Sequence, residues 1–358
     1  MDTLTQALSG ALLARATVPA TAKPGELTPR ARMTAGFVAA AFPDSDIVLR
    51  LLGTLTYIDL HRGVTHSIIL LPAWALLLAW LFSRFSRQRY SWRAFYGTAA
   101  LGIAIHIAGD LFTAYGTMVL APFSHERFAL PFTFIIDPYF TAIIVIGLVA
   151  VMPARRSRYP AVIALAILGC YVGFQGILHS RALRVGEAYA GAQQLDRTAG
   201  EVHAVPQPLS PFNWKIIVNH GDGYDVASVN LRRSERRIPP EPELGIPGIL
   251  GMWGRIDAGY EPVSAARWIR YSRFGKTESQ DALAREAWNQ KIFAPFRDFA
   301  MFPVLDKIES HGSGVCVRFL DLRFTIPSLP PSLGFGVCRD GSTGLWRLRQ
   351  KDGVFGMD

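Results

Sequence analysis

The sequence predicts an all-α membrane domain built from apolar helices, followed by a small α+β soluble domain. Half of the 358 residues are hydrophobic and only 18% are charged, whereas soluble domains average about 25% charged residues. The shortage of charge is confined to residues 1–180, while residues 181–358 form an ordinary mixture rich in Arg, Pro and Gly. We therefore expect a transmembrane domain over 1–180 and a soluble domain over 181–358.

Four long apolar segments are expected to cross the bilayer, because each is near the ~20 residues that a spanning helix needs. They are Ser67–Phe82, Ala94–Ala114, Thr133–Met152 and Ala161–Ser180. Two shorter apolar segments precede them, Leu4–Ala14 and Ala31–Phe42, and are expected either to traverse the bilayer or to enter it and return. The membrane domain is thus predicted to contain four long and two short apolar helices.

Basic residues gather in alternate loops between these segments. The three basic loops contain Arg15, Lys23, Arg30 and Arg32, then Arg84, Arg87, Arg89 and Arg93, then Arg155, Arg156 and Arg158. By the positive-inside rule these loops face the cytoplasm. The formal net charge of +9 is then explained by membrane topology, and no nucleic-acid partner is expected. Both chain ends, and the soluble domain, are expected outside the cytoplasm.

The second half is predicted to mix strands and helices. Trp214–Val218 and Tyr224–Leu231 flank the turn His220-Gly-Asp-Gly223, which is a hairpin signal. Gln280–Phe299 has helical spacing, with a predicted buried stripe of Leu283, Ala287, Ile292 and Phe296. Further strands are expected at Val315–Phe324, Phe335–Arg339 and Leu345–Arg349. Cys316 and Cys338 lie in neighbouring predicted strands, and either a disulfide or two buried thiols fits them.

Three polar stretches interrupt the apolar half: FPDSD at 42–46, HRGVTHS at 61–67 and HIAGD at 106–110. Asp44 and Asp46 lie two residues apart, so in an extended stretch both carboxylates can face one ion. His106 and Asp110 lie four residues apart, which places them on one face of a helix. Each stretch therefore supplies two side chains of the kinds that bind divalent metals.

The expected topology places all of these side chains at the non-cytoplasmic ends of their segments. An ionisable group in a membrane costs roughly 2.5–3.5 kcal/mol, so such groups tend to mark function. Because no matching set of buried cations accompanies them, the sequence predicts a bound cation. Imidazole and carboxylate together suit Zn²⁺, Mn²⁺ or Fe²⁺ better than Ca²⁺ or Mg²⁺. The expected ligands of one or two such ions are Asp44, Asp46, His61, His66, His106 and Asp110.

The ordered set of motifs resembles the predicted membrane-bound metal-dependent hydrolases, a bacterial inner-membrane family that includes DNA-damage-inducible proteins. The matching stretches are MDTLTQALSGALLAR, FPDSD, HRGVTHS, HIAGDLFTAYGT, APFSHERFAL and FIIDP, within roughly residues 1–150. The second half, with SPFNWK and LDLRF, is similar to the longer subgroup. The resemblance implies an inner-membrane, multi-pass protein with metal at the same six positions.

The sequence departs from this family at Gln6, where the family usually has His. A glutamine amide oxygen is a poor replacement for an imidazole ligand. Either this position lies behind a ligand, or one metal is weakened or lost, or the activity of this member is altered.

The leading functional hypothesis is hydrolysis of a phosphoester or ester by metal-activated water, with a lipid or lipid-linked substrate taken from the bilayer. Asp110 or Asp137 would orient the water or act as the base, and Arg62 and His125 would contact a substrate phosphate. Asp137 precedes Pro138 and fits a helix cap equally well. Two alternatives remain: a non-enzymatic, metal-stabilised membrane anchor that presents the soluble domain, and a transporter whose polar groups line an ion path.

Overall fold

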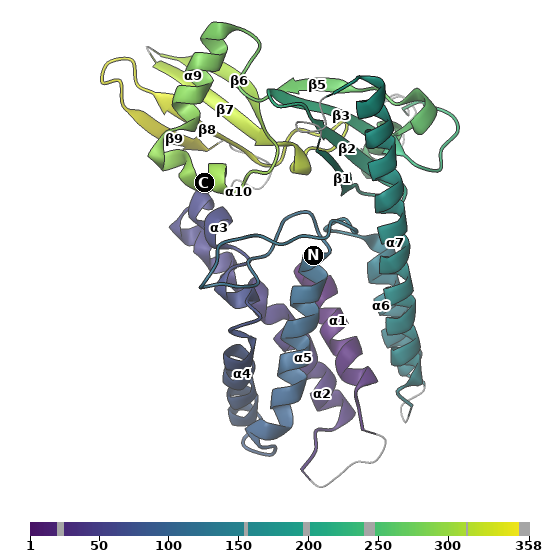
Figure 1. The fold of residues 1–358 in the computed structure, drawn as a ribbon. Helices are drawn as coiled ribbons and strands as arrows, with labels where there is room; N and C mark the ends of the chain where they lie inside the picture. The colour runs from purple at the N-terminus through teal and green to yellow at the C-terminus, as the bar shows by residue number, and fades with distance from the viewer. Residues whose placement is uncertain (20–24, 154–156, 196–200, 240–247, 313, 351–358) are drawn as a thin grey trace. The chain divides into compact units, whose positions relative to one another are not determined.

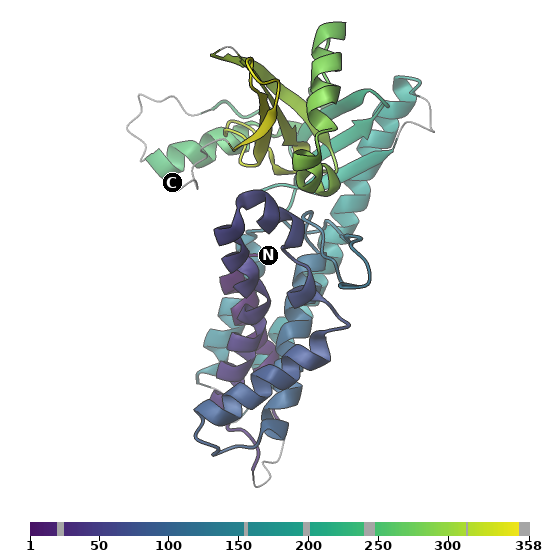
Figure 2. The same cartoon turned by 90° about the vertical axis from the view of Figure 1, so that its left-hand side faces the viewer.

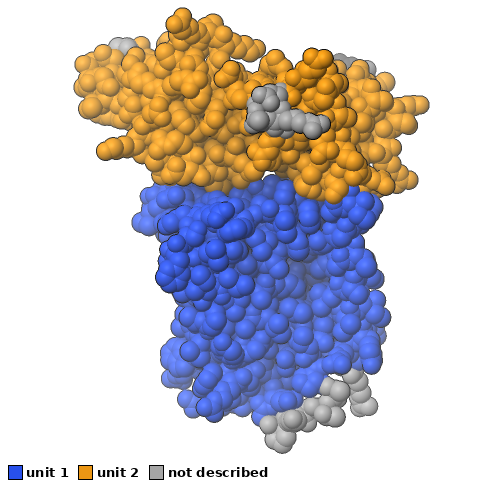
Figure 3. Space-filling view, in the orientation of Figure 1, with its two compact units in different colours: residues 1–177 blue, residues 178–358 orange. Residues whose placement is uncertain are grey.

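The computed structural model describes residues 1–19, 25–153, 157–195, 201–239, 248–312 and 314–350. The chain divides into two compact units, Met1–Ile177 and Leu178–Asp358, which Figure 3 colours blue and orange. The boundary between the units falls inside one long helix, three residues before the end of the predicted membrane domain.

Unit 1 is a bundle of helices. Its helices are α1 (Thr3–Ala16), α2 (Pro29–Ala41), α3 (Thr54–Leu60), α4 (Leu71–Phe85), α5 (Trp92–Leu111), α6 (Pro138–Val151) and the first part of α7 (Tyr159–Ala192), with 3₁₀ segments η1 (Phe42–Leu52) and η2 (Val64–His66). Figures 1 and 2 show α1, α2, α4 and α5 side by side. Helices α6 and α7 pack against α1 through a buried cluster that includes Leu12, Ile144 and Leu168.

Small residues let the central helices approach closely. A Cβ placed on Gly10 of α1 would lie 2.3 Å from the carbonyl oxygen of Gly36 on α2. A Cβ on Gly102 of α5 would lie 2.8 Å from the Cβ of Ala39 on α2. Such contacts are typical of helices that associate in a membrane, where close backbone packing replaces the hydrophobic driving force.

Among the described residues, only α5 and α7 are single helices long and apolar enough to cross a membrane. A third span results if Thr54–His66 and Leu71–Phe85, which are bent by 79° at the break between them, act as one. The expectation of four long spanning helices is therefore wrong. Proline is the reason: Pro72 and Pro138 lie in the first turns of α4 and α6, where a residue without a backbone N–H begins a helix, so both helices are shorter than their apolar segments.

The loops that carry the basic residues gather at one end of unit 1, the lower end in Figure 1. Arg15, at the end of α1, donates from Nη2 to the carbonyl oxygen of Ser157 at 2.8 Å. Leu27, before α2, is buried against Ala79 of α4 and Phe95 of α5. Lys23, Arg155 and Arg156 lie outside the described residues. The polar stretches that contain Asp44, His66 and Asp110 lie at the opposite ends of their helices.

The described residues of unit 2 form two sheets. The first is formed by β1 (Val202–Pro206), β2 (Asn213–Asn219), β3 (Gly223–Asn230) and β4 (Glu261–Pro262) in that order, with β5 (Ile269–Ser272) also paired to β3. The second has the order β6 (Pro303–His311), β7 (Gly314–Asp321), β8 (Gly334–Arg339) and β9 (Trp346–Gln350). The described residues of unit 2 also form the helices α8 (Gly248–Ala258), α9 (Glu278–Trp288) and α10 (Ala294–Phe299), with 3₁₀ segments at Val263–Ala265, Lys291–Phe293 and Leu322–Phe324. The end of α7 packs its Leu178 and Ala182 into the core of the first sheet.

The predicted hairpin is present, because β2 and β3 pair antiparallel and the His220 amide donates to the carbonyl oxygen of Gly223 at 3.1 Å. The predicted helix over Gln280–Phe299 is instead broken after Trp288. Pro295 lies in the first turn of α10 and begins that new helix. The break changes the face that is buried. Ile292 is 45% exposed, and Phe293 is buried in its place.

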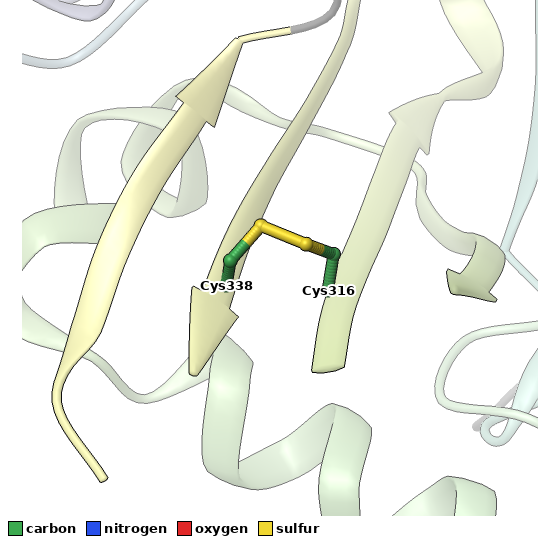
Figure 4. Close-up of a disulfide and its surroundings, with 2 residues drawn as sticks. All are labelled: Cys316 and Cys338. Carbon is green, nitrogen blue, oxygen red and sulfur yellow. A yellow bond between two sulfur atoms is a disulfide. The ribbon is translucent and has the colours of Figure 1, made fainter. Parts of the chain in front are cut away.

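The two cysteines of the second sheet form a disulfide. Cys316 on β7 and Cys338 on β8 stand opposite each other in the antiparallel register, and Figure 4 shows the bond between them. Of the two interpretations that the sequence left open, the disulfide is therefore the one that the structure contains.

Candidate metal centre

Four of the six predicted ligands converge in unit 1. Asp44 comes from η1, His66 ends η2, and His106 and Asp110 lie one turn apart near the end of α5. One donor atom from each of these side chains lies within 4.8 Å of the corresponding atoms of the other three. His66, His106 and Asp110 are fully buried, and the side chain of Asp44 is 13% exposed.

Five of the six distances between the donor atoms are close to the edges of one tetrahedron. His66 Nε2 lies 3.1 Å from His106 Nε2 and 3.2 Å from Asp110 Oδ2, and His106 Nε2 lies 3.4 Å from the same carboxylate oxygen. Asp44 Oδ1 lies 3.6 Å and 3.5 Å from the two Nε2 atoms. A regular tetrahedron with edges of about 3.4 Å has its centre about 2.1 Å from each corner, which matches the usual Zn–N and Zn–O distances.

Both imidazoles present a lone pair to this centre. His106 Nδ1 lies 2.6 Å from the carbonyl oxygen of Ala40, which only accepts, so Nδ1 carries the hydrogen. His66 Nδ1 lies 3.0 Å from the Thr65 hydroxyl, which itself donates to Asp46 Oδ2 at 3.2 Å, so here too Nδ1 is the donor. The two Nε2 lone pairs therefore face each other, and this arrangement is unfavourable unless a cation lies between them.

The carboxylate of Asp110 is divided between two tasks. Its Oδ1 accepts from Arg62 Nη2 at 2.9 Å and from Gln6 Nε2 at 3.1 Å, and it also contacts the Met1 amino group. Its Oδ2 is buried and has no hydrogen-bond donor among the described residues. A buried oxygen without a donor is costly in a protein interior, and Asp110 Oδ2 points at the same centre as the two lone pairs. The donor set therefore fits a divalent metal ion.

Asp46 and His61, the other two expected ligands, lie beside this group and are not part of it. Asp46 Oδ1 and His61 Nδ1 are 2.8 Å apart, and Asp46 Oδ2 accepts from the Arg62 amide at 3.1 Å. The expectation that Asp44 and Asp46 point the same way assumed an extended chain. Residues 42–52 form a 3₁₀ helix instead, in which side chains two residues apart point about 120° apart around the axis.

Arg62 acts as an internal counter-ion. Its side chain is 2% exposed, and its Nη1 donates to the Thr113 hydroxyl at 2.8 Å while Nη2 holds Asp110. The guanidinium also lies over the Tyr115 ring, 4.7 Å from its centroid. The backbone of Arg62 is left-handed, with a φ of 61°, and turns the chain between His61 and His66. Its contacts hold the Asp110 carboxylate in place.

Asp137 occupies the position of a helix cap. Its Oδ1 accepts from the amides of Tyr139 and Phe140 at 2.9 and 3.0 Å, and its Oδ2 accepts from the Tyr171 hydroxyl at 2.8 Å. One oxygen thus caps α6 and the other accepts from α7, and Asp137 is not among the four grouped donors. His125, the other residue expected to contact substrate, lies exposed in the loop before α6.

Comparison with known proteins addresses the resemblance directly. The profile of the family described as YdjM inner membrane protein matches residues 1–182, which is just over half of the chain. The chain belongs to this family. The matched stretch contains all of unit 1 and all four grouped donors. Membership confirms the membrane family that the motifs indicated, and the metal-dependent hydrolase activity stays a prediction.

This chain is similar to a protein of Bacillus subtilis (strain 168) that is named "Uncharacterized protein YfhP". The two are 30% identical over 186 residues, which is 52% of this chain and 56% of the relative. The match therefore spans little more than half of either protein. No solved structure matches this chain.

Several residues that support the centre of this YdjM family member were not predicted. The Thr3 hydroxyl donates to Asp44 Oδ2 at 2.6 Å, and the carbonyl oxygen of Ala40 orients His106. Thr65 lies inside the HRGVTHS stretch, which was a signal that it could contact the flanking imidazoles. No sequence signal marks a backbone carbonyl, so the contact of Ala40 could not have been found without the structure.

Proposed function

We propose that this protein is a membrane-embedded metal-dependent hydrolase. Asp44, His66, His106 and Asp110 would hold one divalent ion, and zinc suits a four-donor tetrahedral set of nitrogen and oxygen atoms best. The observation that carries the proposal is the set of five distances of 3.1–3.6 Å among their donor atoms. One ion is proposed, because Asp46 and His61 are occupied by each other.

A bound divalent ion would lower the pKa of a water molecule towards ~7 and polarise a phosphoryl or carbonyl oxygen. Asp44 is the only one of the four side chains with measurable exposure, at 13%, so water and substrate would approach on its side. The Thr3 hydroxyl and Arg62 would keep the two carboxylates oriented. Since the donors lie within the helical bundle of a membrane protein, the proposed substrate is a phosphoester or ester of a lipid or lipid-linked molecule.

A second candidate has its own support. Catalytic zinc sites usually have three protein ligands and an open position, whereas sites with four protein ligands are usually structural. Four grouped donors therefore also fit a metal-stabilised anchor that presents unit 2 to a partner. The enzyme proposal requires that a water molecule or the substrate can share or displace Asp44.

We also propose a multi-pass orientation in the bacterial inner membrane with unit 2 outside the cytoplasm. Two observations support it. The basic loops gather at one end of unit 1, which the positive-inside rule assigns to the cytoplasm. The disulfide between Cys316 and Cys338 belongs to an oxidising compartment.

The test is to purify the full chain, count its metals by mass spectrometry, and measure hydrolysis of phosphoester lipids. The enzyme proposal expects about one ion per chain and turnover that Asp44→Asn and Asp110→Asn abolish. Asp137→Asn is the matched control, because asparagine also caps helices, and it should retain both metal and turnover. Bound metal without turnover of any such lipid would favour the anchor, and purified chains without metal that also fail to bind added zinc would refute both.

A further inference from the structure

A groove of about 320 Å³ in unit 1 lies between α1, α5, α6 and α7. Nine of its eleven lining residues are apolar or glycine, and the polar ones are Gln6 and Ser9. The Ser9 hydroxyl already donates to the carbonyl oxygen of Thr5 at 2.8 Å. The groove therefore offers a polar ligand almost nothing, apart from the amide of Gln6.

The groove opens between the two helices that are long and apolar enough to span a membrane. Ala108 on α5 and Gly169 on α7 line it and are exposed. The surface around this opening is the apolar surface of the spans, so lipid chains surround it in a bilayer. Filling an apolar groove with water is unfavourable, and a flexible hydrocarbon chain is the neighbouring material that can enter it.

The inner wall of the groove is one side chain away from the metal centre. Gln6 packs flat on α5, where a Cβ on Gly109 would lie 2.7 Å from its Oε1. On the other side, Gln6 Nε2 donates to Asp110 Oδ1 and to the carbonyl oxygen of His106, both at 3.1 Å. A hydrocarbon chain in the groove would therefore contact Gln6, the side chain that donates to the proposed metal ligand Asp110.

We propose that this groove binds an acyl chain of a membrane phospholipid. The assignment of that phospholipid as the substrate rests on the proposed hydrolase function, whereas binding of the chain does not. If both hold, the substrate class is an acylated lipid whose chain is gripped between α5 and α7 while its head group lies near the metal centre.

Gly169 provides a specific way to fill the groove. A Cβ at Gly169 meets nothing within 4 Å, so Gly169→Leu adds a side chain at the lining of the groove without a clash at its Cβ. Gly173 lies one turn further along α7, also has open space at its Cβ, and does not line the groove. Gly173→Leu is therefore a matched control for the change in helix propensity and in surface.

The experiment uses the full chain in phosphatidylglycerol vesicles that contain a phosphatidylglycerol with a diazirine in its acyl chain. After illumination, labelled peptides are mapped by mass spectrometry. We expect labelling at Ile105 and Leu165, which line the groove, reduced at least fivefold by Gly169→Leu and unchanged by Gly173→Leu. A parallel arm with a free diazirine fatty acid should label the groove less strongly, because the proposal names a phospholipid.

Two results would overturn the proposal. Groove labelling no stronger than labelling at Leu76 and Trp80, which form another apolar surface of unit 1, would mean ordinary lipid contact. Groove labelling unaffected by Gly169→Leu would mean that the acyl chain lies elsewhere. Metal counting on the same samples separates the two proposals. Bound metal without groove labelling would refute only the acyl-chain site, and groove labelling without bound metal would refute only the hydrolase function.

Discussion

Metal removal should destabilise unit 1 by several kcal/mol. Without an ion, the carboxylates of Asp44 and Asp110 have their facing oxygens within 4.8 Å of each other. At an effective dielectric constant of about 20, two unit charges at that distance repel by about 3.5 kcal/mol. The facing Nε2 lone pairs of His66 and His106, 3.1 Å apart, add to this cost. An ion present at about 1,000 times its Kd stabilises a folded protein by about 4 kcal/mol, which is similar in size.

The assay is thermal unfolding of the detergent-solubilised protein before and after treatment with a chelator, followed by added zinc. A change of about 4 kcal/mol corresponds to roughly 8–15 °C in Tm for a unit of this size. Asp110→Asn should remove the response to chelator and to zinc, because the amide nitrogen can donate to the Nε2 atoms and one ligand charge is lost. Asp137→Asn should respond as the native protein does. An unchanged Tm in a native sample from which metal had measurably been stripped would refute the tetrahedral assignment.

Three further predictions follow from local structure. Gly10→Ala should destabilise the protein by about 1–3 kcal/mol in chemical denaturation, because its Cβ would lie 2.3 Å from a backbone oxygen. The control Gly97→Ala should stabilise the protein by up to about 1 kcal/mol, because a Cβ there meets nothing within 4 Å. Equal effects of the two variants would contradict the packing of α1 against α2. Replacing Cys316 and Cys338 by serine opens a covalent link between residues 22 apart and should cost about 3 kcal/mol, and in cells both native thiols should react with an impermeant maleimide only after reduction. Burial lowers the pKa of Lys215 to about 7, so above pH 7 the unfolded state binds more protons than the folded state. The free energy of unfolding of unit 2 should therefore rise by on the order of 1–2 kcal/mol between pH 7 and 8.5. A fall over this range would refute the lowered pKa of Lys215.

The sequence predicted which donors lie together where regular secondary structure sets the geometry. His106 and Asp110 were placed together by helical spacing, and the helix α5 that carries them is present. The expected orientation of Asp46 differs from the structure, because nothing in FPDSD distinguishes an extended stretch from the 3₁₀ helix that the structure contains. Residue type could not separate a ligand from its support, since both are made of the same carboxylates and imidazoles.

The membrane helices show a similar limit. Apolar composition located every helix of unit 1 that begins before Pro160, apart from the short α3 within the polar connection. Composition did not fix their lengths, because Pro72 and Pro138 set the starts of α4 and α6 several residues inside the apolar segments. In unit 2, β2, β3, β7, β8 and β9 were predicted, whereas β1, β4, β5 and β6 were missed.

Gln6 is the position where the sequence departs from the family, and the structure shows what its side chain contacts. The four grouped donors lie together without any contribution from residue 6. The Gln6 amide instead donates to the Asp110 oxygen that faces away from the centre. Of the three explanations for the departure, a position behind a ligand accounts for these contacts directly. Since Asp110 Oδ1 is also held by Arg62, the proposed single ion would not require an imidazole at residue 6.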